Sequence, residues 1–137
     1  MTINELTEAV IGACIEVHKQ TGAGLLESTY LQCLCRELTL REIPFQCEYP
    51  LPVRYKGVLL DCGYRIDLLI DGRLVLELKS IEKILPIHEA QLLTYLRLGN
   101  WQVGLLINFN VEVLRLGIKR IVNNLPESAS APSAPLR

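Results

Sequence analysis

Three charged residues, Asp67, Glu77 and Lys79, lie in two leucine-rich segments, RIDLLI and LVLELK, that have the composition of buried β-strands. Burying a carboxylate without a partner is costly, so charges on a core strand require a bound ion or a mutual pairing. Residues two apart on a strand share a face, so Glu77 and Lys79 project together while the leucines between them point the other way. These residues are the first candidates for chemistry.

The turn between the two segments decides whether Asp67 joins the other charges. A two-residue loop at 71–72 would place Asp67 on the opposite face of the sheet from Glu77. A three-residue loop at 71–73, with Gly72 in a left-handed conformation beside a bulge, sets Asp67 directly opposite Glu77. We therefore predict the loop of odd length.

Two carboxylates in this register have β-carbons about 5 Å apart and repel each other in a poorly solvated site. A hard divalent cation resolves the conflict, because Mg²⁺ or Mn²⁺ binds one or two carboxylates and keeps several waters. Lys79 would then lie beside the metal, where it could orient or help deprotonate a water and offset phosphoryl charge. The other arrangement is an ion pair of Lys79 with Asp67 or Glu77, and these three residues alone leave both open.

The helices that must position these residues are indicated by apolar side chains three and four residues apart. The first is predicted over residues 3–20 and is broken by the TGAG run at 21–24. The second begins near Leu25 or Leu26 and ends before Pro44, which forbids continuation. A third covers about 86–98, with its proline in the first turn.

The strands are indicated by a change to a period of two. Residues 45–55, 58–70 and 74–80 predict an antiparallel meander, whose first strand is confined by its prolines to an edge or a bulged position. The segment WQVGLLINF, 101–109, is a nearly unbroken apolar strand of the kind that is buried on both faces. Residues 112–122 predict a last strand or a short helix.

A second set of polar residues has the spacing of helix faces. Glu27 and Tyr30 are three apart on the second helix, Gln91 and Tyr95 are four apart on the third, and His88 adds a turn to the Gln91 face. We expect Tyr30 and His88 to contact the substrate, although a surface or capping role would also explain His88. The order of glutamate, aspartate, Glu-x-Lys and Gln-x-x-x-Tyr along the chain is hard to obtain by chance.

With these residues in order, the sequence resembles the PD-(D/E)xK nuclease superfamily over roughly residues 5–122. It is similar above all to the small family named for Gly-x-x-Glu-x-x-Tyr, here GLLESTY, and the likeness continues through RIDLLI, LVLELKS, HEAQLLTYL, VGLLINF and IKRIV. The resemblance implies an α/β fold with a restriction-endonuclease-like core, in which a mixed central β-sheet is flanked by α-helices.

The resemblance also implies roles for individual residues. It assigns Mg²⁺ or Mn²⁺ to the side chains of Asp67 and Glu77 and the backbone carbonyl of Leu78, with Glu27 as a further ligand or a holder of metal-bound water. Lys79 becomes the catalytic lysine, and Gln91 and Tyr95 position this lysine or the substrate phosphate. One departure is that Ile66, where the superfamily's name has proline, precedes the aspartate.

The function expected from this set is hydrolysis of nucleic-acid phosphodiester bonds, with DNA as the expected substrate, by a metal-activated water. The alternative is a noncatalytic nuclease-like module that binds a protein or nucleic-acid partner. The net charge of −1 gives no global basic field, so nucleic acid must meet a local patch. Arginines and lysines scattered around the predicted site elements could provide it. Trp101 and Tyr49 could stack on bases, or they could simply pack in a core.

The 137 residues, half of them apolar, suffice for one domain, which we place at 1–123, and the Pro- and Ser-rich end at 124–137 predicts a disordered tail. Such a domain is small for enclosing a duplex, so a homodimer or a partner protein is expected to complete the binding surface. No signal peptide or membrane-spanning run is evident, and five cysteines without CxxC spacing indicate reduced thiols. We therefore expect a cytoplasmic protein without membrane contact.

Overall fold

The computed structural model describes residues 1–124. In this part of the chain a mixed β-sheet lies between two layers of helices. The elements are α1 (Ile3–Thr21), α2 (Glu27–Leu40), β1 (Phe45–Pro50), β2 (Val53–Tyr55), β3 (Val58–Leu60), β4 (Arg65–Ile70), β5 (Leu74–Lys79), α3 (Pro86–Gly99), β6 (Val103–Asn108), the 3₁₀ helix η1 (Leu114–Gly117) and β7 (Ile118–Val122). All but one residue of the expected tail at 124–137 lies outside the described residues.

The predicted helices are confirmed, and their ends follow from local chemistry. Thr2 caps α1 in a reciprocal capping box, since the Glu5 N–H donates to Thr2 Oγ1 (3.1 Å) and the Thr2 N–H donates to Glu5 Oε1 (2.8 Å). Gly24 has a φ of +97°, a conformation open to glycine, and separates α1 from α2. At the end of α3, Asn100 adopts the left-handed conformation that stops the helix.

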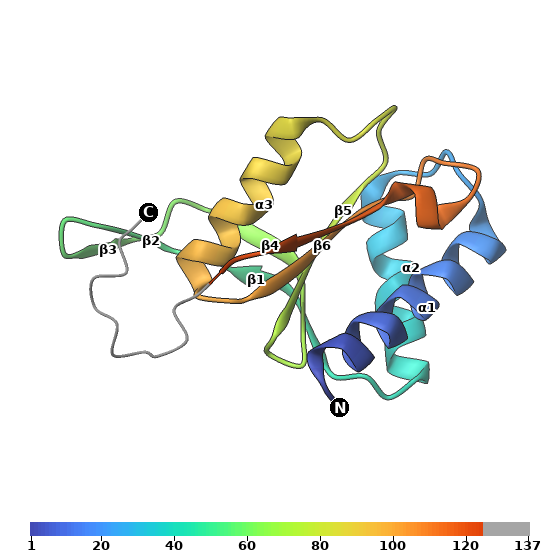
Figure 1. Cartoon of the computed structure of the whole chain (residues 1–137), viewed down its shortest axis with the longest axis horizontal. Helices are drawn as coiled ribbons and strands as arrows, with labels where there is room; N and C mark the ends of the chain where they lie inside the picture. The colour runs from blue at the N-terminus through green and yellow to red at the C-terminus, as the bar shows by residue number, and fades with distance from the viewer. Residues whose placement is uncertain (125–137) are drawn as a thin grey trace.

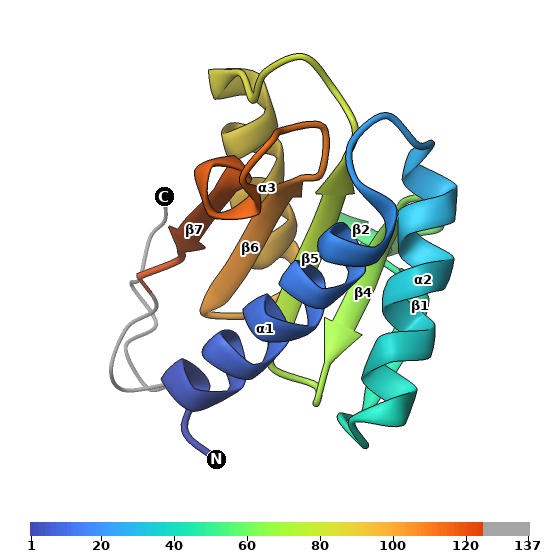
Figure 2. The same cartoon turned by 90° about the vertical axis from the view of Figure 1, so that its right-hand side faces the viewer.

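The main sheet has the strand order β1-β4-β5-β6-β7. Strands β5 and β6 are parallel, and the other neighbours are antiparallel. Helix α3 makes the crossover between the two parallel strands and covers one face, whereas α1 and α2 lie together on the other face (Figures 1 and 2). Figure 2 shows β4 and β5 side by side behind the two N-terminal helices.

Apolar residues fill both sides of this sheet, but unequally. The larger core lies between the sheet and helices α1 and α2, and the smaller core lies under α3. Every residue of β6 is buried, which confirms the prediction of a strand covered on both faces. The segment at 112–122 contains both predicted alternatives in succession, because η1 leads directly into β7.

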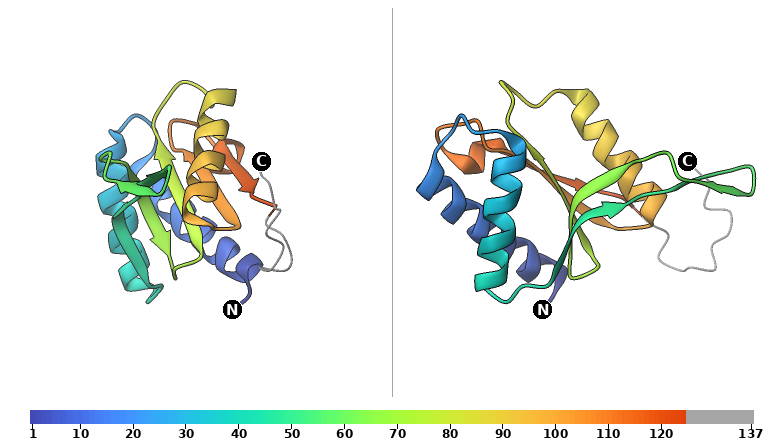
Figure 3. Two further views of the ribbon diagram at one scale, coloured as in Figure 1. Left: turned by 90° about the vertical axis from the view of Figure 1, so that its left-hand side faces the viewer. Right: turned by 180° about the vertical axis from the view of Figure 1, so that it is seen from behind.

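The prediction of long continuous strands at 45–55 and 58–70 is wrong. Each segment breaks in the middle. The two parts that lie next to each other in sequence pair as a separate hairpin, β2–β3, that projects away from the main sheet (Figures 1 and 3). Pro52, which has no N–H to donate, lies at the break. The other two parts, β1 and β4, form the predicted meander with β5, and β1 occupies the sheet edge as its proline, Pro50, requires.

The turn between β4 and β5 has the predicted odd length. Ile70 pairs with Leu74, so the loop contains the three residues 71–73, and Gly72 has a φ of +69°. This register continues through the pair Leu68 and Leu76. The pairing of the two strands therefore directs Asp67 and Glu77 toward each other.

Two glycines provide a matched test of the packing. A β-carbon on Gly117 would overlap the backbone carbonyl of Asn108, whereas one on Gly12, in α1, would meet only the end of the Arg41 side chain at 3.5 Å. We predict that Gly117→Ala lowers the free energy of unfolding by roughly 1–3 kcal/mol because of overpacking. Gly12→Ala should raise it by about 0.5–1 kcal/mol through helix propensity. Urea unfolding of the two variants measures both, and equal effects would contradict this packing.

Candidate active site

The backbone pairing of β4 and β5 stops one residue pair before their carboxylates, and side chains replace the missing bonds. The N–H of Asp67 donates to Glu77 Oε2 (2.9 Å), and the N–H of Leu78 donates to Asp67 Oδ2 (2.7 Å). Leu69 and Val75, each two residues away, belong to the core under α3, so the two carboxylates also lie on this face. Each acid is thus fixed by the backbone of the opposite strand.

Burial of this pair strongly disfavours two negative charges. Glu77 is only 8% exposed, and its burial together with the nearby charge of Asp67 raises its pKa from 4.5 to about 8. Burial also raises the pKa of Asp67, while the hydrogen bond from the Leu78 N–H opposes this shift. Near neutral pH the isolated pair therefore retains a proton, which a bound cation would displace.

Lys79 lies near the two carboxylates but forms no ion pair with either of them. Its positive charge lowers the pKa values of both Asp67 and Glu77. The four ion pairs within residues 1–124 are Arg41–Glu37, Arg65–Asp61, Arg73–Asp71 and Arg115–Glu8. The simple alternative of a Lys79 ion pair with either acid is therefore wrong for this structure, and the half-buried ammonium has no carboxylate partner within 4.0 Å in the described chain.

Glu27 begins α2 and reaches the end of β5 from the other side. The N–H of Ser80 lies 3.4 Å from Glu27 Oε2, and the Ser80 hydroxyl donates to the carbonyl of Leu25 (2.6 Å). The charge of Glu27 contributes to the raised pKa values of Asp67 and Glu77, but no three acidic, histidine or cysteine side chains within residues 1–124 form a cluster suited to a metal ion. Glu27 instead lines a hollow of about 370 Å³ together with Ser28 and Ser80.

Tyr30, expected to contact the substrate, is fully buried in the structure. Its hydroxyl donates to the carbonyl of Gly22 (2.5 Å) and accepts the N–H of Leu25 (3.2 Å). Its ring stacks on Phe109 with centroids 4.4 Å apart. Tyr30 therefore holds the loop that leads to Glu27, and its side chain is not accessible to a substrate.

Helix α3 presents its polar residues to the site in different ways. Tyr95 is 8% exposed, and its pKa is raised by burial and by the charges of Glu77, Tyr64 and Asp67, which places it beside the carboxylates. Gln91, one turn earlier, is exposed. The Nδ1 atom of His88 accepts the N–H of Leu85 (2.9 Å), so His88 caps the helix, which is the alternative role expected for it from the sequence. Its Nε2 atom takes no part in this cap.

Two residues that were not predicted from the sequence, Ser80 and Asn108, hold the loop after β5. Ser80 ties this loop to the start of α2, as described above. Asn108, at the end of β6, is 2% exposed; its Oδ1 accepts the N–H of Ile81 (3.1 Å), and its Nδ2 donates to the carbonyl of the same residue (2.9 Å). A polar residue that ends a wholly apolar strand is the signal that could have revealed Asn108.

This sheet, its two helical layers and the acidic strand pair define an α/β protein with a restriction-endonuclease-like core. The family model described as the PD-(D/E)XK nuclease superfamily matches residues 4–121, and the chain belongs to this superfamily. The match does not confirm the narrower Gly-x-x-Glu-x-x-Tyr family. Comparison with curated proteins and with solved structures finds no match.

Membership suggests a nuclease-like function, because members of this superfamily are usually metal-dependent phosphodiesterases that act on nucleic acid. The superfamily typically uses divalent metals. Within residues 1–124, no helix has both the length and the apolar character needed to cross a membrane.

The buried acid pair makes stability depend on pH in the presence of a chelator. The pKa of Glu77 is higher in the folded chain, so its contribution to stability is complete below pH 4.5 and is lost as the pH rises to about 8. Glutamine does not ionise, and its amide oxygen can still accept the Asp67 N–H. We predict that Glu77→Gln raises the free energy of unfolding at pH 8 by roughly 1–4 kcal/mol and has little effect at pH 4.5.

Denaturant unfolding at the two pH values measures this difference. Glu82→Gln is the control, because it removes the same charge from an exposed residue of the following loop. A Glu77→Gln variant that is equally stable or less stable than the unmodified chain at pH 8 would contradict the electrostatic cost assigned to this pair.

Proposed function

We propose that this protein is a metal-dependent nuclease that hydrolyses phosphodiester bonds, with DNA as its substrate. The observation that supports this most strongly is the carboxylate pair of Asp67 and Glu77, fixed by reciprocal backbone hydrogen bonds beside an ammonium group, Lys79, that makes no ion pair in the described chain. A purely structural pair of this kind would be expected to use the nearest lysine as its counter-ion.

The donor set fits Mg²⁺ or Mn²⁺. A buried and a half-buried carboxylate that resist simultaneous ionisation form a site that a divalent cation would stabilise, and these ions need only one or two carboxylates. We propose Asp67, Glu77 and the carbonyl of Leu78 as direct ligands, with Glu27 holding a metal-bound water. When bound, the ion would supply charge stabilisation for the phosphate and lower the pKa of water.

The chain's own residues would bind and orient the phosphodiester. The Lys79 ammonium would donate to the attacked phosphate and stabilise the charge that develops there. Tyr95 would hold the lysine or a phosphate oxygen in place, and the exposed Gln91 amide would contact the phosphate. The Nε2 of His88, which is not used by the helix cap, would donate to the neighbouring phosphate of the same strand.

Two finer features belong to the same proposal. We propose that a homodimer or a partner protein completes the nucleic-acid surface, and a monomeric mass in solution combined with tight DNA binding would contradict this. We also propose a cytoplasmic location, which the five free cysteines support.

Metal binding is the first test. Calorimetric titration of Mn²⁺ should show one saturable site in the unmodified chain, weakened at least about tenfold by Asp67→Ala or Glu77→Ala because each removes a direct ligand. Glu82→Ala, in the exposed loop after β5, is the matched control and should bind as the unmodified chain does. Absence of Mn²⁺ binding would contradict the nuclease proposal and favour a noncatalytic nuclease-like module.

Cleavage is the second test. With Mn²⁺ present, the protein should cut single-stranded, duplex or branched DNA, and Lys79→Ala should reduce the rate by roughly 10²–10⁴-fold while Mn²⁺ binding persists. Lys83→Ala, a nearby exposed lysine, is the control and should retain activity. The nuclease proposal fails if a metal-loaded preparation cuts none of these substrates, and cleavage of RNA alone contradicts the choice of DNA.

A further inference from the structure

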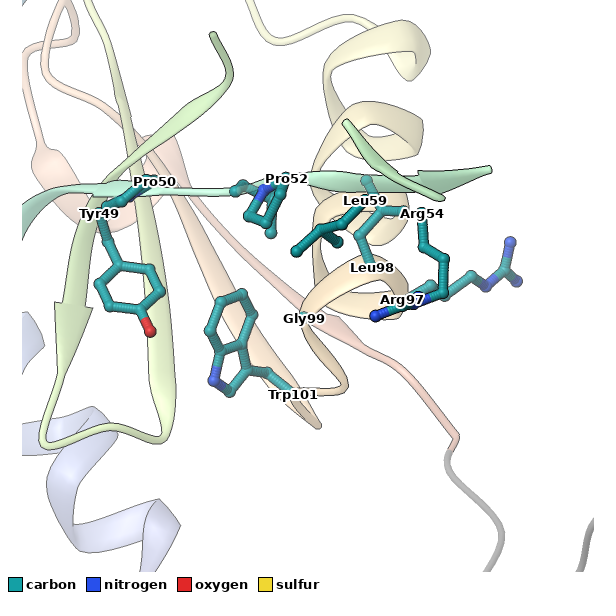
Figure 4. Close-up of a pocket in the computed structure, with 10 residues that line it drawn as sticks. Tyr49, Pro50, Pro52, Arg54, Leu59, Arg97, Leu98, Gly99 and Trp101 are labelled. Atoms are coloured by element: carbon teal, nitrogen blue, oxygen red, sulfur yellow. The ribbon is translucent and has the colours of Figure 1, made fainter. Parts of the chain in front are cut away.

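A second recess lies on the α3 side of the molecule, apart from the carboxylates. It is a groove of about 470 Å³ between the end of β1, the β2–β3 hairpin and the C-terminal end of α3 (Figure 4). The residues that carry the argument are Tyr49, Pro52, Arg54, Arg97, Gly99 and Trp101. In this part of the molecule, the hairpin described above as separate from the main sheet forms one wall of a groove.

The aromatic residues of the groove are held in place. The rings of Tyr49 and Trp101 meet edge to face, with centroids 6.0 Å apart and planes inclined by 72°. The indole lies directly over Gly99, where a β-carbon would overlap it. Figure 4 shows the indole beside Gly99 at the end of the helix, with Tyr49 on its other side and Pro52 above it. A rigid aromatic surface of this kind suits stacking by a flat ligand.

The charge of the groove selects the class of ligand. Arg54, from the hairpin, and Arg97, from α3, line it together, and no acidic residue does. Neither arginine belongs to an ion pair within residues 1–124. Two arginines that line the same groove as an aromatic surface match a ligand that combines a flat base with phosphate charge.

The groove is connected to the carboxylate site through two elements. On α3, Tyr95 lies beside the carboxylates and Gly99 lies in the groove, one helical turn or about 6 Å further along. Across the sheet, Tyr49 pairs with Ile66, the residue before Asp67. A strand bound at the carboxylates therefore needs only a few nucleotides to reach the groove.

We propose that this groove binds an unpaired base of a single-stranded segment that flanks the bond to be cut. The base would stack on Trp101 while Arg54 and Arg97 contact the adjacent phosphates. A paired base has its faces covered by its neighbours, so only an unpaired one can stack on a side chain. The inference rests on the proposed function for the choice of nucleic acid, and it adds a preference for single-stranded substrate.

Trp101 is the sole tryptophan of the chain, so its fluorescence reports on the groove alone. With a chelator present to prevent metal-dependent cleavage, titration with a short oligothymidylate should quench this fluorescence to saturation. A blunt duplex of equal length and free thymidine monophosphate should quench it at concentrations at least about tenfold higher. Equal quenching by the duplex or by the free nucleotide would overturn the assignment to a single strand, and no quenching by any probe would overturn the site.

The arginines give a test that does not disturb the core, because both variants lie on exposed side chains. Arg54→Ala and Arg97→Ala should each weaken binding of a fluorescently labelled oligothymidylate roughly 3- to 10-fold and reduce the dependence of log affinity on log salt by about 0.7. Arg36→Ala is the matched control, since it removes an exposed arginine from α2 on the other side of the sheet. Equal effects of the three substitutions would mean that the two groove arginines contribute only nonspecific charge attraction, and this would overturn the proposal.

Stacking is tested separately with the same labelled strand. Trp101→Leu should weaken binding roughly 5- to 150-fold, while Trp101→Phe, which keeps an aromatic face, should restore most of the affinity. Equal affinity of the two variants would contradict a stacked base. These measurements need no metal, so loss of cleavage with the quenching intact would refute the nuclease proposal alone, and cleavage without quenching would refute the groove alone.

Discussion

The structure of the candidate site depends on one exchange of hydrogen bonds between β4 and β5. Where the regular pairing ends, the carboxylate of Glu77 takes the N–H of Asp67, and the carboxylate of Asp67 takes the N–H of Leu78. Two backbone donors that would otherwise be buried without partners are satisfied, and two acids are oriented at the same time. The hydrogen bonds that join the ends of β4 and β5 therefore also hold the two carboxylates close together despite their mutual repulsion.

The rest of the fold supports this exchange from both faces. Behind it, Tyr30 and Ser80 fix the start of α2, which carries Glu27, and Asn108 fixes the loop after β5. In front of it, the parallel crossover places α3, and with it Tyr95, over the carboxylates. These supports come from segments that are distant in sequence, so the site exists only once both helical layers have docked on the sheet.

Much of this could be predicted because it depends on local chemistry. The three-residue turn at 71–73 follows from the requirement that buried charges share a face, and the position of the first strand at the edge follows from Pro50 at its end and Pro52 just beyond it. The separation of the β2–β3 hairpin from the main sheet could not be predicted in this way, because all four strands keep their expected partners and an alternating pattern does not show where a strand pair breaks. The burial of Tyr30 was also hidden, since its spacing from Glu27 is compatible with either a substrate contact or a contact with its own loop.

The two cores also differ in how firmly they hold their helical layers. The larger one secures α1 and α2, whereas the smaller one under α3 buries fewer apolar side chains. Less apolar area removed from water means a lower free energy for partial opening, so α3 is the layer whose amide protons should exchange earliest. Partial opening of the α3 layer would expose Asp67 and Glu77 to solvent while α1 and α2 stay packed on the other face of the sheet. The helical layer expected to open first is therefore the one that covers the acid pair.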